Sequence, residues 1–146
     1  MKKHMNKMKN SVKMMAMAVI GAAVFCLAGC GTAKLPDGFD EDRIRESSME
    51  AIGYFNEKDY ESLINMGNEQ FKDAITEEQF ADACDPYLDK NGAFKEITKE
   101  VFAGNTDKKT GESYGGVVMV GEYEDGKIQF TIAFDENMEL VQFYIK

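Results

Sequence analysis

The sequence predicts an α+β domain in which N-terminal helices pack on a four-stranded antiparallel meander sheet. Between residues 40 and 92, apolar residues recur every three or four positions, which is the period of an amphipathic helix. After Gly92 the apolar residues alternate with polar ones, as in half-buried strands. The whole chain has 146 residues, enough for one ordinary domain.

The first 29 residues are typical of a secretory signal peptide. Five lysines precede an uncharged apolar run from Met14 to Ala28, and small residues follow, which is the usual layout of such a signal. An uncleaved membrane helix is the alternative. The strongly apolar part is shorter than the roughly 20 residues that cross a bilayer, which favours the signal.

Residues Leu27-Ala28-Gly29-Cys30 resemble the lipobox of bacterial lipoproteins. The resemblance implies diacylglyceryl transfer to the Cys30 sulfur and cleavage between Gly29 and Cys30. It also implies a lipid-anchored location on the extracytoplasmic face of the cell membrane, because two or three acyl chains anchor stably. We therefore expect a lipidated Cys30 with a short tether over residues 30–39, followed by a single α+β domain over residues 40–146.

Three helical pieces are expected in the first half of this domain. Asp40 is a suitable N-cap for the first, and Asn56–Asp59 interrupts its apolar pattern. Asp59 caps a second piece that ends at Gly67, and Phe71 to Ile75 form one further apolar turn.

A capping box, Thr76 to Gln79, begins the third piece. Pro86 lacks an N–H, so it predicts a kink or a restart of the helix with Asp85 as the cap. Asn91 and Gly92 supply the left-handed ending.

The second half reads as four strands joined by tight connections. They are expected at Phe94 to Ala103, Tyr114 to Tyr123, Ile128 to Phe134 and Val141 to Ile145. Val117 to Val120 is apolar on both faces, so its strand should be central in the sheet. The segment from Gly104 to Ser113 is expected to be a long loop.

Composition excludes several classes of function. The chain has 17 Lys+Arg against 26 Asp+Glu, for a net charge of −9, which argues against nucleic-acid binding. The single histidine, His4, leaves with the signal, which removes Ser-His-Asp and Cys-His catalysis and every histidine-containing metal site. We expect no metal and no cofactor.

Cysteine chemistry is limited in the same way. Once Cys26 is removed with the signal and Cys30 is lipidated, Cys84 is the one remaining thiol. It lies on the apolar face of its helix, where it is expected to be a small buried hydrophobe.

Two acidic sets are candidate sites. A line of carboxylates at helical spacing is interpreted as a solvated face, because a Ca²⁺ site needs six to eight converging oxygens. A carboxylate on a strand beside a tyrosine hydroxyl is the sharper hypothesis, since such a pair can act in proton transfer. The first set is Glu78, Asp82, Asp85 and Asp89; the second is Glu96, Glu100, Glu122 and Glu124.

Aromatic residues are the candidate lining of a ligand pocket, or the filling of the core. A domain of this size needs most of its large apolar side chains for stability, so the core interpretation is favoured. The aromatic set is Tyr54, Phe55, Tyr87, Phe94, Phe102, Phe130, Phe134 and Phe143. The residues predicted to line a pocket are Tyr54, Tyr87, Phe102 and Tyr114.

Several of these motifs together resemble an uncharacterised bacterial family of small exported domains. They are Asn56 to Tyr60, Phe71, Thr76 to Phe80, and Gly92 to Phe94 at the entry to the sheet. The resemblance implies a nuclear transport factor 2-like, cone-shaped fold. That fold hosts isomerases, dehydratases and binding modules, so it does not determine function.

The expected function is therefore a membrane-anchored, extracytoplasmic lipoprotein domain that binds without catalysis. Its expected partner is a small apolar ligand or an envelope protein, and a homodimer through the uncovered sheet face is a further expectation. The alternative is a proton-transfer enzyme of the isomerase or dehydratase type, with a buried carboxylate and a tyrosine in the cone.

Overall fold

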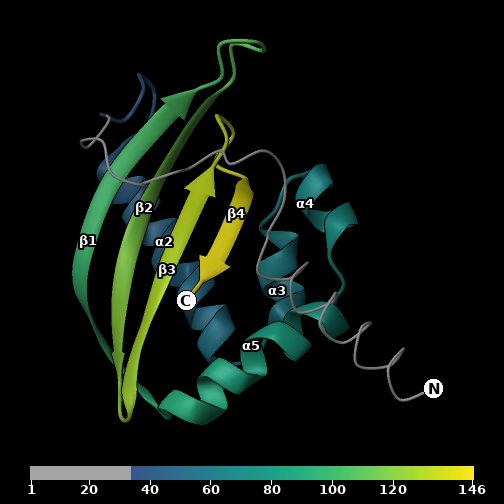
Figure 1. Ribbon diagram of the computed structural model, residues 1–146. Helices are drawn as coiled ribbons and strands as arrows, with labels where there is room; N and C mark the ends of the chain where they lie inside the picture. Colours follow the sequence, from purple (N-terminus) through teal and green to yellow (C-terminus); the bar gives the residue numbers. More distant parts are fainter. Residues whose placement is uncertain (1–33) are drawn as a thin grey trace.

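The computed structural model describes residues 34–146, and Gly29, Cys30 and the predicted signal peptide lie outside the described residues. Within that range, four helices precede a four-stranded antiparallel sheet, so the α+β prediction is confirmed (Figure 1). The helices are α2 (Glu41–Asn56), α3 (Tyr60–Asn65), α4 (Glu69–Ala74) and α5 (Glu77–Asn91). The strands are β1 (Phe94–Thr106), β2 (Ser113–Tyr123), β3 (Gly126–Phe134) and β4 (Leu140–Ile145). No helix of the described part is long and apolar enough to cross a membrane.

Helix α2 begins and ends where the sequence predicts. The side chain of Asp40 accepts a hydrogen bond from the backbone N–H of Asp42 at 2.8 Å, which satisfies one of the free donors of the first turn. Its apolar face, including Ile44, Ile52 and Phe55, is fully buried against the sheet.

Three helical pieces are expected, but the described residues contain four helices, because Phe71 lies in a separate helix, α4. The side-chain oxygen of Asn68 accepts a hydrogen bond from the N–H of Phe71 at 2.9 Å and starts α4. This cap, together with the burial of Phe71, turns the expected single apolar turn into a short helix.

The expected restart of the helix at Pro86, with Asp85 as its cap, is also wrong. Helix α5 is continuous from the Thr76 capping box to Asn91, with Pro86 inside it. Pro86 cannot donate to the carbonyl of Asp82, but both residues are exposed, so water can satisfy that carbonyl. The ending at Gly92 is confirmed, with a φ of 74°.

The sheet is a meander in the order β1-β2-β3-β4. Strand β1 continues through Gly104 to Thr106, which pairs with Ser113. The predicted loop from Gly104 to Ser113 is therefore reduced to the turn at Asp107–Glu112. Backbone pairing with β2, which local sequence does not reveal, extends the strand. The connection between β2 and β3 consists of Glu124 and Asp125.

One outer edge of the sheet is already paired where β4 begins. Leu140 donates to the carbonyl of Met66 at 2.8 Å and accepts from the N–H of Asn68 at 3.1 Å, which makes a parallel bridge at Gly67. Helix α4 lies next to the same strand (Figure 1). Among the described residues, no strand pairs with the outer edge of β1.

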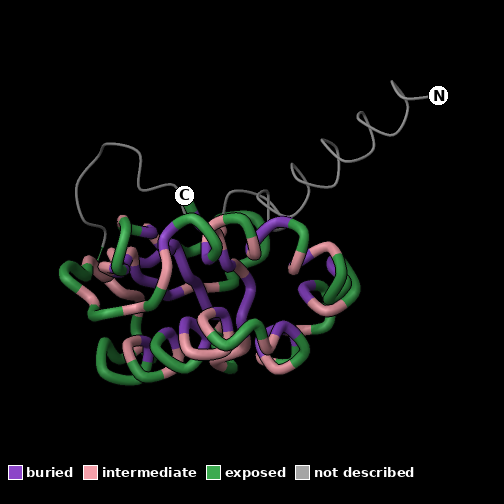
Figure 2. Tube along the Cα trace, turned by 90° about the horizontal axis from the view of Figure 1, so that it is seen from below, coloured by how far each residue is buried: buried purple, intermediate pink, exposed green. Residues whose placement is uncertain are grey.

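The core lies between the helical layer and one face of the curved sheet. In Figure 1 the helices lie behind and beside the sheet, and Figure 2 shows buried residues concentrated between the layers. Val117 and Met119 of β2 face the helices and are fully buried. Val118, which lies between them, points to the opposite face of the sheet, because side chains alternate along a strand.

Packing onto this core starts before α2. Leu35 and Phe39 contact the hydrophobic core, although the sequence placed them in the tether. A Cβ atom at Gly104 would overlap Pro36, and one at Gly115 would overlap Phe39, so both glycines make room for this segment. We call residues Leu35–Phe39 the strap.

Candidate functional site

The four residues predicted to line a pocket lie on different parts of the molecule. Tyr54 is half-buried on α2, and its hydroxyl donates to Glu50 one turn earlier at 3.0 Å. Tyr87 is half-buried on α5. Phe102 shares the helix-facing side of the sheet with its partner Val117, whereas Tyr114 points to the other side. The register therefore places Phe102 and Tyr114 on opposite faces.

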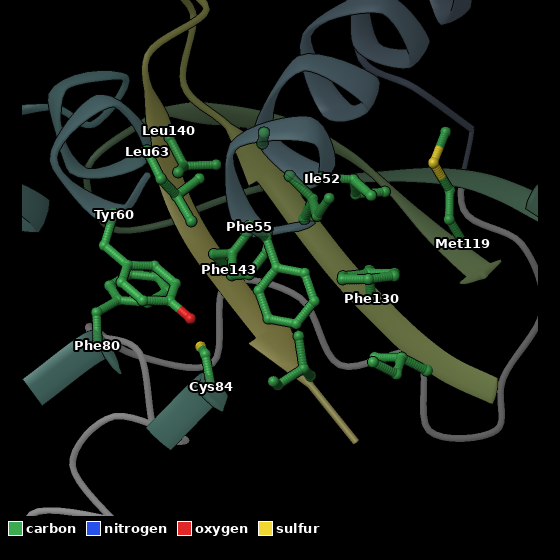
Figure 3. Close-up of a cluster of buried hydrophobic side chains, with 14 of the residues drawn as sticks. Ile52, Phe55, Tyr60, Leu63, Phe80, Cys84, Met119, Phe130, Leu140 and Phe143 are labelled. Atoms are coloured by element: carbon green, nitrogen blue, oxygen red, sulfur yellow. The ribbon is translucent and has the colours of Figure 1, made fainter. Parts of the chain in front are cut away.

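The centre between helices and sheet is filled by aromatic rings. Phe55 packs edge-on against Phe130 with ring centroids 5.3 Å apart, and both rings contact Phe143 at 5.9 Å (Figure 3). Phe80 links Phe143 to Tyr60, which stacks on it at 5.5 Å. Phe55 and Phe130 are completely buried. These residues act as core, as the favoured interpretation of the aromatic set expects.

A tyrosine–carboxylate pair lies at the edge of this aromatic cluster, where α3 meets α5. The hydroxyl of the buried Tyr60 donates to Asp85 at 2.6 Å. Lys58, in the turn before α3, lies 3.4 Å from Asp89 and 3.8 Å from Asp85. Burial, and then the hydrogen bond to Asp85, raise the pKa of Tyr60. The phenol therefore stays protonated and clamps α3 to α5.

The carboxylates proposed from the strands are not the ones that meet tyrosines. The hydroxyls of Tyr54, Tyr60 and Tyr114 donate to Glu50, Asp85 and Glu112, respectively. The Tyr114 pair is mostly exposed, and its hydrogen bond raises the pKa of Tyr114 to about 12. In these three pairs the carboxylate lies on a helix or in a turn and not on a strand.

Glu100 instead binds Arg45, a residue that sequence analysis did not select. The Arg45 guanidinium donates to both carboxylate oxygens of Glu100, at 2.6 Å for its closest contact, and to Asp42 at 2.6 Å. It also lies over the Phe102 ring, 5.1 Å from the centroid. The only sequence signal was the Asp42–Arg45 spacing on α2. With its donors engaged, Arg45 holds strand β1 to α2.

Cys84 and the acidic residues of α5 have structural rather than catalytic contacts. Cys84 is buried, and this burial raises the pKa of its thiol, so the sulfur is unreactive. Glu78, Asp82 and Asp89 are exposed, whereas Asp85 holds Tyr60 and Lys58. Within residues 34–146 no group of acidic, cysteine or histidine side chains is placed to hold a metal ion.

The remaining candidate surface is the face of the sheet that points away from the helices. Val101, Val118, Thr131 and Tyr144 form one row across all four strands of this face. The next row is Ala103, Gly116, Ala133 and Gln142. We call these two rows the open face; Ala103, Gly116, Thr131 and Ala133 are buried in it, and the other four residues are half-buried. The helices of the described part lie on the other side of the sheet (Figure 1).

The open face differs from the helical layer in charge. Its two rows carry no ionisable group other than the Tyr144 phenol, whereas the helical segment between residues 41 and 91 has many more acidic than basic side chains. Such an apolar and small-residue surface is suited to contact with another protein surface. The acidic helical layer is suited to contact with water.

Comparisons with known proteins give a family and one solved relative. A family described as protein of unknown function (DUF3887) matches residues 48–143. An NMR structure of a protein from Ruminococcus gnavus ATCC 29149 is similar, with 36% sequence identity and a TM-score of 0.68. The similarity covers 79% of this chain and 98% of that one. The comparison with curated proteins finds no match.

Proposed function

Because the chain belongs to the DUF3887 family of proteins of unknown function, its function rests on its own residues, and we propose a non-catalytic protein-binding domain. The observation that carries the proposal is the open face, which the described helices leave uncovered. The aromatic filling of the core supports a surface rather than an internal pocket as the place of binding.

We propose further that the domain is anchored by lipid on the extracytoplasmic face of the cell membrane. Leu27-Ala28-Gly29-Cys30 at the end of an apolar segment supports this proposal. A sheet that curves around α2 supports the nuclear transport factor 2-like cone as the fold type. The protein partner is then a second copy of the chain or another envelope protein.

The anchor is tested with Cys30→Ala. We expect the variant to lose palmitate labelling and to accumulate in an unprocessed form, because the thioether forms on that sulfur. Cys84→Ser is the matched control and should keep the label. Unchanged labelling of Cys30→Ala would contradict the lipobox assignment.

The binding surface is tested by cross-linking in native membranes. Val118→Cys places a thiol in the middle of the open face, and Met49→Cys places one on the exposed outer side of α2 as the control. The buried Cys84 adds little background. We expect a maleimide–benzophenone reagent, attached to the thiol and then photoactivated to insert into a nearby C–H bond, to give a covalent adduct through position 118 and not through position 49.

The mass of that adduct identifies the partner. Twice the mass of the chain supports self-association, and another mass supports a different envelope protein. Failure of Val118→Cys to form any adduct above the Met49→Cys level would reject the open face as the binding surface.

A further inference from the structure

The strap packs against one end of the sheet, and this end is therefore the part of the domain nearest in the chain to the proposed lipid at Cys30. Pro36 lies against Gly104, two residues before the end of β1, and Phe39 lies against Gly115, at the start of β2. The strap therefore lies at the end of the sheet that carries the turns Asp107–Glu112 and Asp135–Glu139. We call this the strap end. The β2–β3 turn at Glu124–Asp125 lies at the opposite end of the same strands.

The distance between Cys30 and the strap is short compared with the domain. Five residue steps separate Cys30 from Leu35 and span at most about 18 Å. The ten residue steps of β1 from Phe94 to Gly104 span about 33 Å at the usual rise per residue. An anchor at Cys30 therefore keeps the strap end within reach of the lipid headgroups, and the far end reaches them only if the domain lies flat.

The surface of the domain does not favour a flat position. Met49 is the single large hydrophobic side chain that is exposed among the described residues, so neither face has the protruding apolar side chains that insert into a membrane interface. The helical layer is acidic, which opposes contact with anionic lipids. The open face has no cluster of basic residues in its two rows.

We propose that the strap makes the strap end the membrane-facing end of the domain, so that the strands stand upright on the lipid surface and the open face points sideways. The partner of the open face is then a protein domain that stands beside it at the same membrane. This inference rests on the proposed lipidation of Cys30.

Two cysteine reporters in the full-length protein test the orientation. Lys109→Cys lies in the turn of the strap end, and Asp125→Cys lies in the matched turn at the opposite end; both positions are exposed. Each variant reacts in native membranes with a small maleimide and with a maleimide on a long polyethylene glycol chain. Dividing the second rate by the first removes local differences in thiol reactivity.

We expect this ratio to be at least about fivefold lower for Lys109→Cys than for Asp125→Cys, because the gap under the strap end is at most about 18 Å. Detergent should abolish the difference. Insertion of about 20 Gly/Ser residues between Lys34 and Leu35 should abolish it as well, since such a linker widens the gap by its own coil dimension.

Other outcomes overturn the inference in distinguishable ways. Equal ratios at both positions, with Cys30 shown to be lipidated by intact mass, mean that the domain is free to turn or lies flat; the orientation is then wrong and the anchor stands. A lower ratio at Asp125→Cys means that the domain is inverted. Absence of lipid on Cys30 overturns both the anchor and the orientation.

Discussion

Ser48 and Lys58 lie at positions that are energetically unfavourable for their residue types. Ser48 is fully buried on α2, and among the described residues its hydroxyl has no hydrogen-bond partner. Lys58 has a φ of 58°, in the left-handed region that non-glycine residues seldom adopt. Its ammonium lies near Asp85 and Asp89, so ion pairs offset part of the backbone cost.

Replacement of Ser48 by alanine is predicted to stabilise the domain. Ser48→Ala removes a buried hydroxyl with no partner and adds a better helix former, so the free energy of unfolding should rise by about 1–2 kcal/mol. Urea denaturation measures this change. Ser47→Ala, on the same helix but half-buried, is the control and should change stability less. A loss of stability in Ser48→Ala would mean that the hydroxyl is hydrogen-bonded.

Tyrosine ionisation should make the fold sensitive to alkaline pH. Burial raises the pKa of Tyr123, and burial together with the Asp85 hydrogen bond raises the pKa of Tyr60, relative to an ordinary value of about 10. Since the folded-state pKa is the higher one, the stabilisation is complete below pH 10. It is lost as the pH rises above 10.

Denaturation at a series of pH values measures this loss. The tyrosine contribution to the free energy of unfolding should not change with pH below pH 10 and should decrease above pH 10. Tyr123→Phe, which also loses the hydrogen bond to Asn56, should reduce the slope of that decrease. A slope that is identical in Tyr123→Phe and the parent would exclude Tyr123 as a source.

The ends of the helices are determined mainly by neighbouring residues, whereas the length of a strand also depends on its pairing partner. The caps at Asp40 and Thr76 and the ending at Gly92 are set by neighbouring residues, so they could be predicted. The length of β1 is set by pairing with β2, and the course of α5 through Pro86 is set by exposure. Neither property is encoded within a few residues, so the sequence predicts a shorter first strand and allows a restart of the helix at Pro86.

Helix α5 should become more stable without its proline. Pro86→Ala restores an N–H donor to the carbonyl of Asp82 and removes no buried contact, because Pro86 is exposed. We expect a gain of about 1–3 kcal/mol in the free energy of unfolding. Lys90→Ala on the same helix should stay within about 0.5 kcal/mol of the parent. No gain in Pro86→Ala would indicate that the helix has adapted to the proline.

At the scale of the whole molecule, the candidate surfaces arise from tertiary contacts. Arg45 and Glu100 are 55 positions apart, and their contact depends on how α2 crosses the sheet. The open face, in contrast, could be anticipated from a meander whose helices all come before it. The pocket prediction depends on residue type alone, and residue type does not determine the face on which an aromatic side chain lies.

The aromatic core should dominate the stability of the molecule. Phe130→Ala removes contacts with Phe55 and Phe143 at the centre of the core and should cost about 3–5 kcal/mol in chemical denaturation. Val118→Ala, on the open face, should cost clearly less. A loss below about 1 kcal/mol in Phe130→Ala would be incompatible with a packed ring at this position.

The parallel bridge at Gly67 has a consequence for strand exchange between molecules. The bridge occupies the outer side of β4 at Leu140, so a foreign strand cannot pair with the start of β4, whereas among the described residues no strand pairs with the outer edge of β1. Two chains joined through β1 would then present only their β4 sides outward. On each of these β4 sides the bridge at Leu140 already fills the first pairing positions, which works against growth into a fibril.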